Sequence, residues 1–379
     1  MVQPEVGMNI SHFGLQRQYV NLKDELLDAT DGVLSSGVLM SGPYTTKFEN
    51  WLCERTGAKY AVTVHSGTQA LEIIARHAAI RDAELRNHSV PYIPPPKITL
   101  PNITYRATLN AFITTGWEVT LGDTDNDGIL QTPDKIDDPY WREDTHWCVV
   151  GLFGARPWPK YSLMDHSRVI VDGAQHWLVA GDNIGFGMAI SFDPTKNLPS
   201  SGNGGAIVTN DDRLYDYALT YRNNGVDPKT NMNWIRDECA GTNSRMSEQE
   251  CAQILVRTKY LDEWQERRRK IKDYWCEQFT GIVRCLSAGV EHHSDQKFVL
   301  ASPYNIELGK FLEENGINTK VHYPYTLKEL PVAREFSAPN CLDTSTVLGK
   351  RLLSLPIYPE LDDVEVEYIA QTIKEFYAD

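Results

Sequence analysis

The sequence has little of what disulfide-rich, membrane-spanning or nucleic-acid-binding proteins require. Its seven cysteines are scattered over 379 residues, odd in number and without a C-x-x-C pair, so we expect neither a disulfide framework nor a metal site. No apolar run approaches the roughly 20 residues that span a bilayer. Basic residues are outnumbered 37 to 51, and the resulting formal charge of −14 opposes broad contact with nucleic acid or anionic membrane.

The start of the chain, MVQPEVGMNISHFG, lacks the basic-then-apolar pattern of a secretion signal. Together with the cysteine usage, this predicts a cytoplasmic protein with reduced thiols. A chain of 379 residues is too long for one ordinary core, so two domains are expected. We place a large domain at residues 1–250 and a smaller C-terminal domain at residues 251–379.

Short apolar segments alternate with helical patterns through the first 210 residues. The strand-like segments include AVTV (61–64), RVIVD (168–172) and GMAISF (187–192). Such a pattern predicts an α/β fold with a mainly parallel sheet that is covered on both faces. After about residue 245 a long, charged helical stretch leads into a smaller α+β tail, and the proline-rich residues 84–97 are predicted to be a surface loop.

The ends of several helices are marked in the sequence. QYVNLKDELLDATDGVLSSG and TTKFENWLCERTG have helical spacing of apolar residues and are predicted to stop at Gly37 and Gly57. A threonine is expected to cap the second of them. Ser247 and Glu250 have the spacing of a capping box.

Three short motifs follow predicted strands. SGTQAL (66–71) opens a helix, where free N–H groups, hydroxyls and the helix dipole can bind a phosphate; taken alone, an ordinary N-cap is favoured. VDGAQH (171–176) places Asp172 at a strand end, facing the crevice where ligands of α/β sheets lie; a simple cap explains it equally well. Lys196 in SFDPTKN lies between a strand and a glycine-rich turn, although most single lysines are solvated.

One cofactor requires all three motifs together. Pyridoxal 5′-phosphate (PLP) needs a lysine for its aldehyde, a cup for its phosphate, and a carboxylate that keeps its ring nitrogen protonated. A lysine with a lowered pKa can form the Schiff base. Tyr105, at a predicted strand-to-helix junction, could stack on the ring. The joint occurrence of these parts favours a PLP site.

The sequence resembles the DegT/StrS-type sugar aminotransferases, which are PLP enzymes of fold type I, the aspartate aminotransferase-like class. The resemblance covers nearly the whole chain and rests on LSSGVLMSGPYTTKFENWLCERTGAKYAVTVHSGTQAL, TYRATLNAF, VDGAQH, SFDPTKNLPSSGNGGAIVTND, GTNSRMSEQECA, KVHYP and LLSLPIYPEL. It implies a seven-stranded, mainly parallel sheet with a smaller C-terminal domain. It also implies a homodimer with shared active sites.

The resemblance assigns roles to individual residues. Lys196 would carry PLP and move the proton between the substrate Cα and the cofactor, and Asp172 would pair with the ring nitrogen. Tyr105 would stack on the ring and Gln175 would contact its hydroxyl. The phosphate would be held by Gly67, Thr68, Ser191 and, from the neighbouring subunit, Asn243. The sugar side would be lined by His322, Tyr323 and Arg245, although a hydrogen-bonded core histidine is an equal alternative for His322.

The function predicted is amino transfer from L-glutamate to a keto sugar that is linked to a nucleotide. The alternatives are a sugar dehydratase, which carries histidine at the position of Lys196, and a non-catalytic PLP-binding regulator. A hydrolase is disfavoured, since G-x-S-x-G and H-E-x-x-H are absent and the pair His292–His293 is expected to be solvated. The segments around residues 84–97, Gly173 and His176, and 325–336 depart from the family pattern and leave the sugar open.

Overall fold

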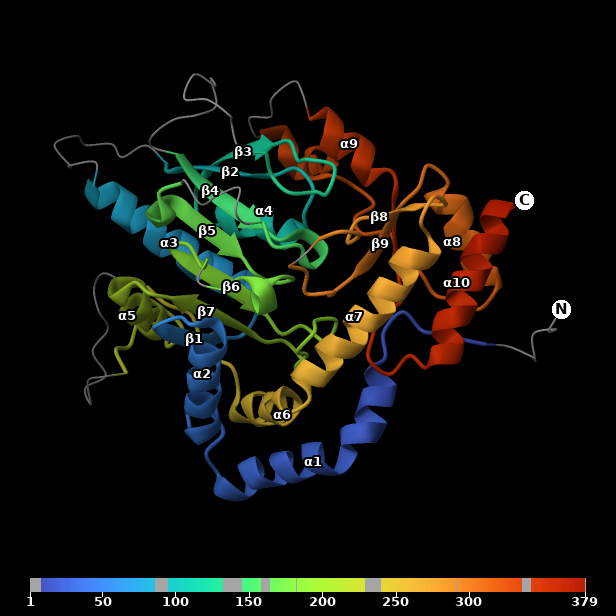
Figure 1. Ribbon diagram of the computed structural model, residues 1–379. Helices are drawn as coiled ribbons and strands as arrows, with labels where there is room; N and C mark the ends of the chain where they lie inside the picture. Colours follow the sequence, from blue (N-terminus) through green and yellow to red (C-terminus); the bar gives the residue numbers. More distant parts are fainter. Residues whose placement is uncertain are drawn as a thin grey trace.

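The computed structural model describes residues 8–85, 95–131, 145–157, 164–181, 183–228, 240–290, 292–335 and 342–378. Its central sheet consists of Tyr60–Val64 (β1), Lys97–Pro101 (β2), Glu118–Gly122 (β3), Thr145–Val150 (β4), Val169–Asp172 (β5), Gly187–Ser191 (β6) and Gly205–Thr209 (β7). The strand order is β1-β7-β6-β5-β4-β2-β3 (Figure 1). In this sheet β7 runs opposite to the other strands, which are parallel to one another, so the predicted fold class is confirmed.

Helices cover both faces of this sheet because successive side chains of a strand point to opposite faces. On one face Ile170 of β5 packs in a core with helices α3 (Gly67–Leu85), α4 (Arg106–Ile113) and α5 (Asp212–Tyr221). On the other face Val169 and Val171 pack in a core with α2 (Pro43–Thr56) and α6 (Glu248–Thr258). Burial on both faces explains why the strands read as continuous apolar runs.

A second, three-stranded antiparallel sheet lies in the C-terminal part, with the order β10-β9-β8. The elements here are α7 (Leu261–Gln278), β8 (Arg284–Cys285), β9 (Phe298–Ala301), α8 (Asn305–Glu314), α9 (Asp343–Gly349), β10 (Leu352–Leu355) and α10 (Asp363–Ala378). Short 3-10 helices span Leu152–Gly154, His166–Arg168, Trp177–Val179, Leu327–Glu329 and Pro331–Glu335. The division into domains at residue 250 stays a prediction. No helix in the described ranges is long and apolar enough to cross a membrane.

The helix stops were predicted correctly, but the long charged stretch after residue 245 is not one helix. Gly37 and Gly57 end α1 (Leu15–Ser36) and α2 in left-handed backbone conformations, with φ of 69° and 71°. The stretch breaks into α6 and α7 at Lys259 and Tyr260, where neither glycine nor proline marks the break. The change of direction packs Val256 of α6 and Trp264 of α7 into one apolar cluster with the side chains of α1.

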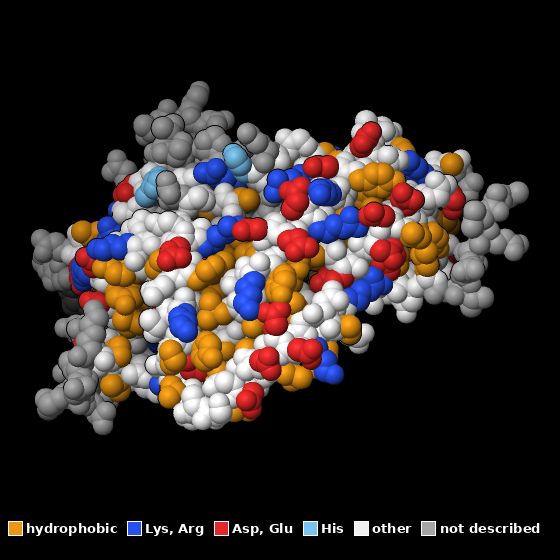
Figure 2. Space-filling model, turned by 60° about the horizontal axis from the view of Figure 1, so that its bottom comes forward, with side chains coloured by type: hydrophobic (Ala, Val, Ile, Leu, Met, Phe, Trp, Pro, Cys, Tyr) orange, Lys and Arg blue, Asp and Glu red, His pale blue; other side chains and the backbone are white. Residues whose placement is uncertain are grey.

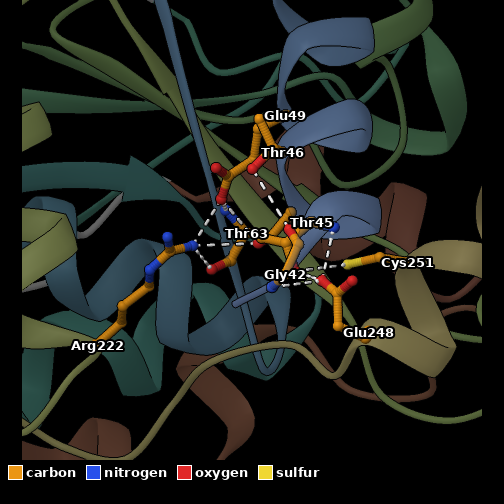
Figure 3. A network of polar contacts seen from close by, with 8 residues as sticks. All are labelled: Gly42, Thr45, Thr46, Glu49, Thr63, Arg222, Glu248 and Cys251. Atoms are coloured by element: carbon orange, nitrogen blue, oxygen red, sulfur yellow. Dashed lines mark hydrogen bonds and ion pairs between the residues drawn. The ribbon is translucent and has the colours of Figure 1, made fainter. Parts of the chain in front are cut away.

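The predicted threonine cap of α2 is wrong, since the helix begins two residues earlier, at Pro43. Its first N–H groups are instead satisfied by the buried carboxylate of Glu248 from α6 (Figure 3). This carboxylate accepts hydrogen bonds from the N–H groups of Gly42, Tyr44 and Thr45 at 2.9, 2.8 and 2.7 Å. A cap that comes from more than 200 residues away in the chain cannot be seen in the local sequence. The capping box of Ser247 and Glu250 is confirmed.

A neighbouring network fixes residues 241–247 against the end of β1. Arg222 pairs with Glu49 at 2.6 Å and donates to the carbonyl of Thr63 at 2.7 Å (Figure 3). Ser244 donates its N–H to the carbonyl of Arg222 at 3.1 Å and accepts from the N–H of His65 at 2.7 Å. The loop that carries the G-x-N-x-R-M pattern is therefore held beside the SGT corner.

Candidate active site

A cavity of about 510 Å³ lies at the carboxyl ends of the central parallel strands. Val150, Asp172 and Ser191, which end β4, β5 and β6, all line it. This is the edge at which open α/β sheets bind their ligands. The predicted site residues that the structure brings together here are Gly67, Thr68, Tyr105, Asp172, Gln175, Ser191, Lys196, His322 and Tyr323.

The SGT corner both caps a helix and offers donors to the cavity. The Ser66 hydroxyl accepts from the N–H of Gln69 at 3.1 Å, and α3 begins at Gly67. The first turn of any helix leaves N–H groups without an intrahelical acceptor, and here these groups border the cavity. A Cβ on Gly67 would lie 2.8 Å from the Cβ of Ser191, so only glycine permits this close approach. The two interpretations of this motif are therefore compatible.

Asp172 is a buried carboxylate that faces the cavity. Its two oxygens accept hydrogen bonds from the hydroxyl of Thr108 at 2.8 Å and from the N–H of Ala174 at 3.1 Å. Burial raises the pKa of Asp172, against the opposing effects of these hydrogen bonds and of Lys196. A carboxylate that has lost its hydration gains most from a cation, such as a protonated ring nitrogen, in the cavity.

Lys196 extends into the same cavity from a turn that follows β6. The turn is closed by the N–H of Lys196, which donates to the carbonyl of Asp193 at 2.9 Å, and by the Asp193 carboxylate, which accepts from the N–H of Thr195 at 2.9 Å. Burial lowers the pKa of Lys196, although Asp172 and Asp193 oppose the shift. A lysine whose ammonium form is disfavoured is suited to attack a carbonyl and to accept a proton.

Gln175 is held from two sides. Its side-chain oxygen accepts from the N–H of Phe153, and its amide nitrogen donates to the hydroxyl of Tyr323 at 2.9 Å. The ring of Tyr323 lies 5.8 Å from that of Tyr105, which is 52% exposed. One amide hydrogen of Gln175 is left to reach a ligand, so its predicted contact with a ring hydroxyl stays a prediction.

His322 has features of both roles considered for it, a hydrogen-bonded histidine and a residue that lines the cavity. Its Nδ1 lies 2.8 Å from the hydroxyl of Ser354, and its ring also lines the cavity. Burial and the neighbouring positive charges, chiefly that of Lys297, lower the pKa of His322 to about 2. The ring is therefore neutral near pH 7.

Asn243 and Arg245 do not line the cavity of their own chain. Asn243 is exposed, and its carboxamide oxygen lies 3.5 Å from the guanidinium of Arg245. Their assigned roles in binding stay predictions. If they hold, the residues act on the cavity of another subunit.

Three further residues that line the cavity were not among the predicted site residues: Phe13, Lys297 and Lys320. Lys297 directly precedes the apolar strand β9, and a charge at the start of such a strand was the available signal. The expectation for His293 was wrong: its ring is buried and lies 2.8 Å from the Asp295 carboxylate. Among the described residues no three His, Cys, Asp or Glu side chains are grouped as metal ligands.

The cavity fits PLP on three independent observations. The corner formed by Gly67 and Ser191 has room for no Cβ but presents N–H groups and hydroxyls to a phosphate. Burial makes a charged Asp172 costly unless a cation lies beside it, and burial also lowers the pKa of Lys196. Three separate motifs thus bring to one cavity the kinds of group that the phosphate, ring and aldehyde of this cofactor require.

Comparison with known proteins gives the same result. The chain is 27% identical to a "Pleiotropic regulatory protein" of Geobacillus stearothermophilus, over 98% of this chain and 99% of that protein. It is also 27% identical to the dTDP-3-amino-3,4,6-trideoxy-alpha-D-glucose transaminase of Streptomyces venezuelae, over 96% and 94% of the two chains. The crystal structure of S. venezuelae DesV in complex with a ketimine intermediate superposes with a TM-score of 0.83 at 26% identity, covering 98% and 99%.

The match to a family extends over most of the sequence. Residues 20–139 and 179–374 match the DegT/DnrJ/EryC1/StrS aminotransferases. The resemblance noted in the motifs is thereby confirmed, and so are the enzyme class and the cofactor. The chain belongs to the DegT/DnrJ/EryC1/StrS aminotransferase family, whose members depend on PLP.

Proposed function

We propose that this protein transfers the amino group of L-glutamate to a ketone of a nucleotide-linked sugar. The observation that carries the proposal is the meeting of Lys196 and Asp172 in one cavity, beside the SGT corner. The S. venezuelae relative, a transaminase of a dTDP-linked amino sugar, supports this class of acceptor. The particular sugar and its carbon are left to experiment.

When bound, PLP would supply an aldehyde that reacts with amines and a ring that withdraws electrons from the substrate Cα. Gly67, Thr68 and Ser191 would hold the phosphate through N–H groups and hydroxyls. Asp172 would stabilise the positive charge on the ring nitrogen. Lys196, once released by the incoming amine, would take the proton from Cα and deliver it to the neighbouring carbon of the cofactor.

A non-catalytic regulator is the rival that one comparison favours, because the Geobacillus relative is named a regulatory protein. Such a protein would keep PLP but would not exchange amino groups. The dehydratase alternative conflicts with Lys196, because the sugar dehydratases that share this fold carry histidine at the position of this lysine. The two remaining candidates thus differ in whether the bound cofactor reacts with an amino acid.

The function is tested in two steps. L-Glutamate added to the PLP-loaded protein should change the absorption of the cofactor and release one 2-oxoglutarate for each site. The aminated protein is then mixed with nucleotide-linked keto sugars, and the amino sugar is identified by mass. No reaction with any amino acid would favour the regulator, and reaction with another amino acid alone would correct the donor.

We also propose a homodimer in which each active site uses both subunits. Val20, Leu27 and Leu34 are 72%, 51% and 58% exposed, and their seven-residue spacing places them on one face of α1. Val38, Leu39 and Met40 continue this apolar surface. Figure 2 views the molecule from the side on which α1 lies, and hydrophobic side chains gather on this face. A second copy of the chain is the occupant we propose for it, since exposed Asn243 would then reach the partner's cavity.

Mixed dimers test the shared site. A Lys196→Ala subunit and an Asn243→Asp subunit should each be poorly active, because the second change puts a negative charge beside the phosphate. After subunit exchange, half of the dimers carry one site with both residues intact, so the mixture should recover about a quarter of the wild-type activity. A mixture no better than the mean of its parents, with exchange confirmed, would mean that each site comes from one chain.

The cytoplasm is the location we propose. Cys53, Cys148, Cys251, Cys276 and Cys285 are free thiols in the described part of the chain. Free thiols persist where the surroundings are reducing. We further propose that residues 1–250 and 251–379 form the two domains, in keeping with the separate sheets on either side of residue 250.

A further inference from the structure

A second buried amino group faces the active-site cavity from the C-terminal part of the chain. Lys297 is only 7% exposed, and it lines the cavity together with Lys196. Its main-chain N–H donates to the carbonyl of Phe153 at 3.2 Å, which fixes its position before β9. Among the ion pairs of the described residues, none involves Lys297. A buried ammonium group without a carboxylate partner is costly unless a ligand supplies the anion.

The surroundings of Lys297 are positively charged. Lys320 also lines the cavity, and its Nζ lies 4.5 Å from the centre of the Phe13 ring. Burial, followed by the charges of Lys196, Lys320 and Arg268, lowers the pKa of Lys297 to about 7, and only Asp193 opposes this shift. An anion placed between these amino groups would relieve their mutual repulsion.

The acids of the cavity are already engaged. The described carboxylates that line it are Asp172 and Asp193. Asp172 accepts from Thr108 and faces the proposed ring nitrogen, and Asp193 accepts from the N–H and hydroxyl of Thr195 at 2.9 and 2.6 Å. The proposed phosphate position, at the SGT corner, does not include Lys297. The partner of Lys297 is therefore expected to arrive with a substrate.

We propose that Lys297, assisted by Lys320, binds a carboxylate of a substrate in the active-site cavity. The inference rests on the proposed function, because an amino-acid donor carries a carboxylate on the very carbon that exchanges a proton with Lys196. No arginine of the same chain is among the described residues that line the cavity, and besides Lys196 the cations that this chain offers to the group are Lys297 and Lys320. The shared chemistry is a carboxylate, and a uronic acid in the acceptor sugar is its other source.

The test uses the PLP-loaded, full-length protein and glutarate, a dicarboxylate that has no amine to react. Calorimetric titration should show that Lys297→Met weakens glutarate binding by at least about tenfold, since a charge-assisted hydrogen bond is lost. Lys297→Arg keeps the charge and should stay within about threefold of the wild type. Lys310→Met removes an exposed lysine of α8 and should change nothing. Glutaramide, the neutral counterpart, should not bind.

The kinetics with L-glutamate, together with titrations of UDP-glucuronate and UDP-glucose, identify which substrate carries the carboxylate. If Lys297→Met weakens glutarate and lowers kcat/KM for L-glutamate by a similar factor, the carboxylate is that of the donor. If it weakens UDP-glucuronate but neither glutarate nor UDP-glucose, the carboxylate belongs to the acceptor. If both acids bind Lys297→Met as tightly as the wild type, the proposal is wrong.

The pH dependence provides a readout that a structural role would not change. Since the ammonium form binds the acid, the Kd for glutarate should rise above about pH 7 in the wild type and stay flat to higher pH in Lys297→Arg. The titratable and charged groups that face Lys297 are Lys196, Lys320, Arg268, Asp193, His12 and His322. They are common to both proteins, so the difference between the two profiles belongs to residue 297.

Failure of this inference can be told apart from failure of the proposed function. Cofactor occupancy and borohydride labelling of Lys196 are measured on the same samples. A protein that holds PLP on Lys196 but binds both acids independently of Lys297 contradicts the carboxylate site alone. A protein that does not hold PLP on Lys196 contradicts the proposed function.

Discussion

Lys196→Ala should lower the rate of amino transfer by roughly a thousandfold or more, because Lys196 is both the proposed attachment point of PLP and the proposed proton carrier. The other parts of the cavity stay in place: the SGT corner, Asp172 and the turn at Asp193 are held by their own hydrogen bonds. The variant should therefore still bind the cofactor through its phosphate. Single-turnover conversion of L-glutamate to 2-oxoglutarate measures the loss.

Lys297 makes this experiment sharper, since it is a second amino group in the same cavity. Borohydride reduction and peptide mapping of the wild type should label Lys196. The same treatment of Lys196→Ala should give no label, and the double variant Lys196→Ala/Lys297→Met should show whether residual turnover depends on Lys297. A label on Lys297 in the wild type, or a loss of less than about tenfold in Lys196→Ala, would contradict the assignment.

Most of the fold could be predicted from local sequence, and so could several of the residues that line the cavity. The strands were predictable because a parallel sheet buried on both faces requires apolar runs, and the stops at Gly37 and Gly57 because left-handed backbone favours glycine. The meeting of Lys196 and Asp172 in one cavity was predictable because Asp172 ends one strand and Lys196 follows the next, and parallel strand ends meet at one edge of the sheet.

What the sequence did not predict depends on contacts between distant segments. Glu248 caps α2 across about 200 residues, and the break at Tyr260 is set by packing against α1. Lys297 lines the cavity only because folding brings the start of β9 beside the cavity. His293 appeared solvated because EHHSDQ is polar, yet tertiary packing buries it beside Asp295.

Asp172→Asn should retain PLP but lose about a hundredfold or more of the transamination rate, which corresponds to roughly 2.7 kcal/mol of barrier. Asparagine has nearly the same shape, and its carboxamide oxygen can still accept a hydrogen bond from Thr108 or Ala174. The substitution therefore removes the charge and leaves the packing. A ring nitrogen without an anionic partner is protonated less, and a neutral ring withdraws electrons poorly from the substrate Cα.

Asp193→Asn is the matched control for this prediction, because it removes an equal charge from the lining of the same cavity. Its oxygen can still accept from Thr195, so the turn that carries Lys196 is kept, and the rate should fall by less than about tenfold. Equal losses in the two variants would mean that the rate depends on the net charge of the cavity and not on which residue carries the charge. Asp172→Asn activity within about threefold of the wild type, under ~0.7 kcal/mol, would remove Asp172 from the ring nitrogen. A large loss confined to Asp172→Asn therefore locates the ring at the end of β5, and with it the face of the cavity from which Lys196 must act.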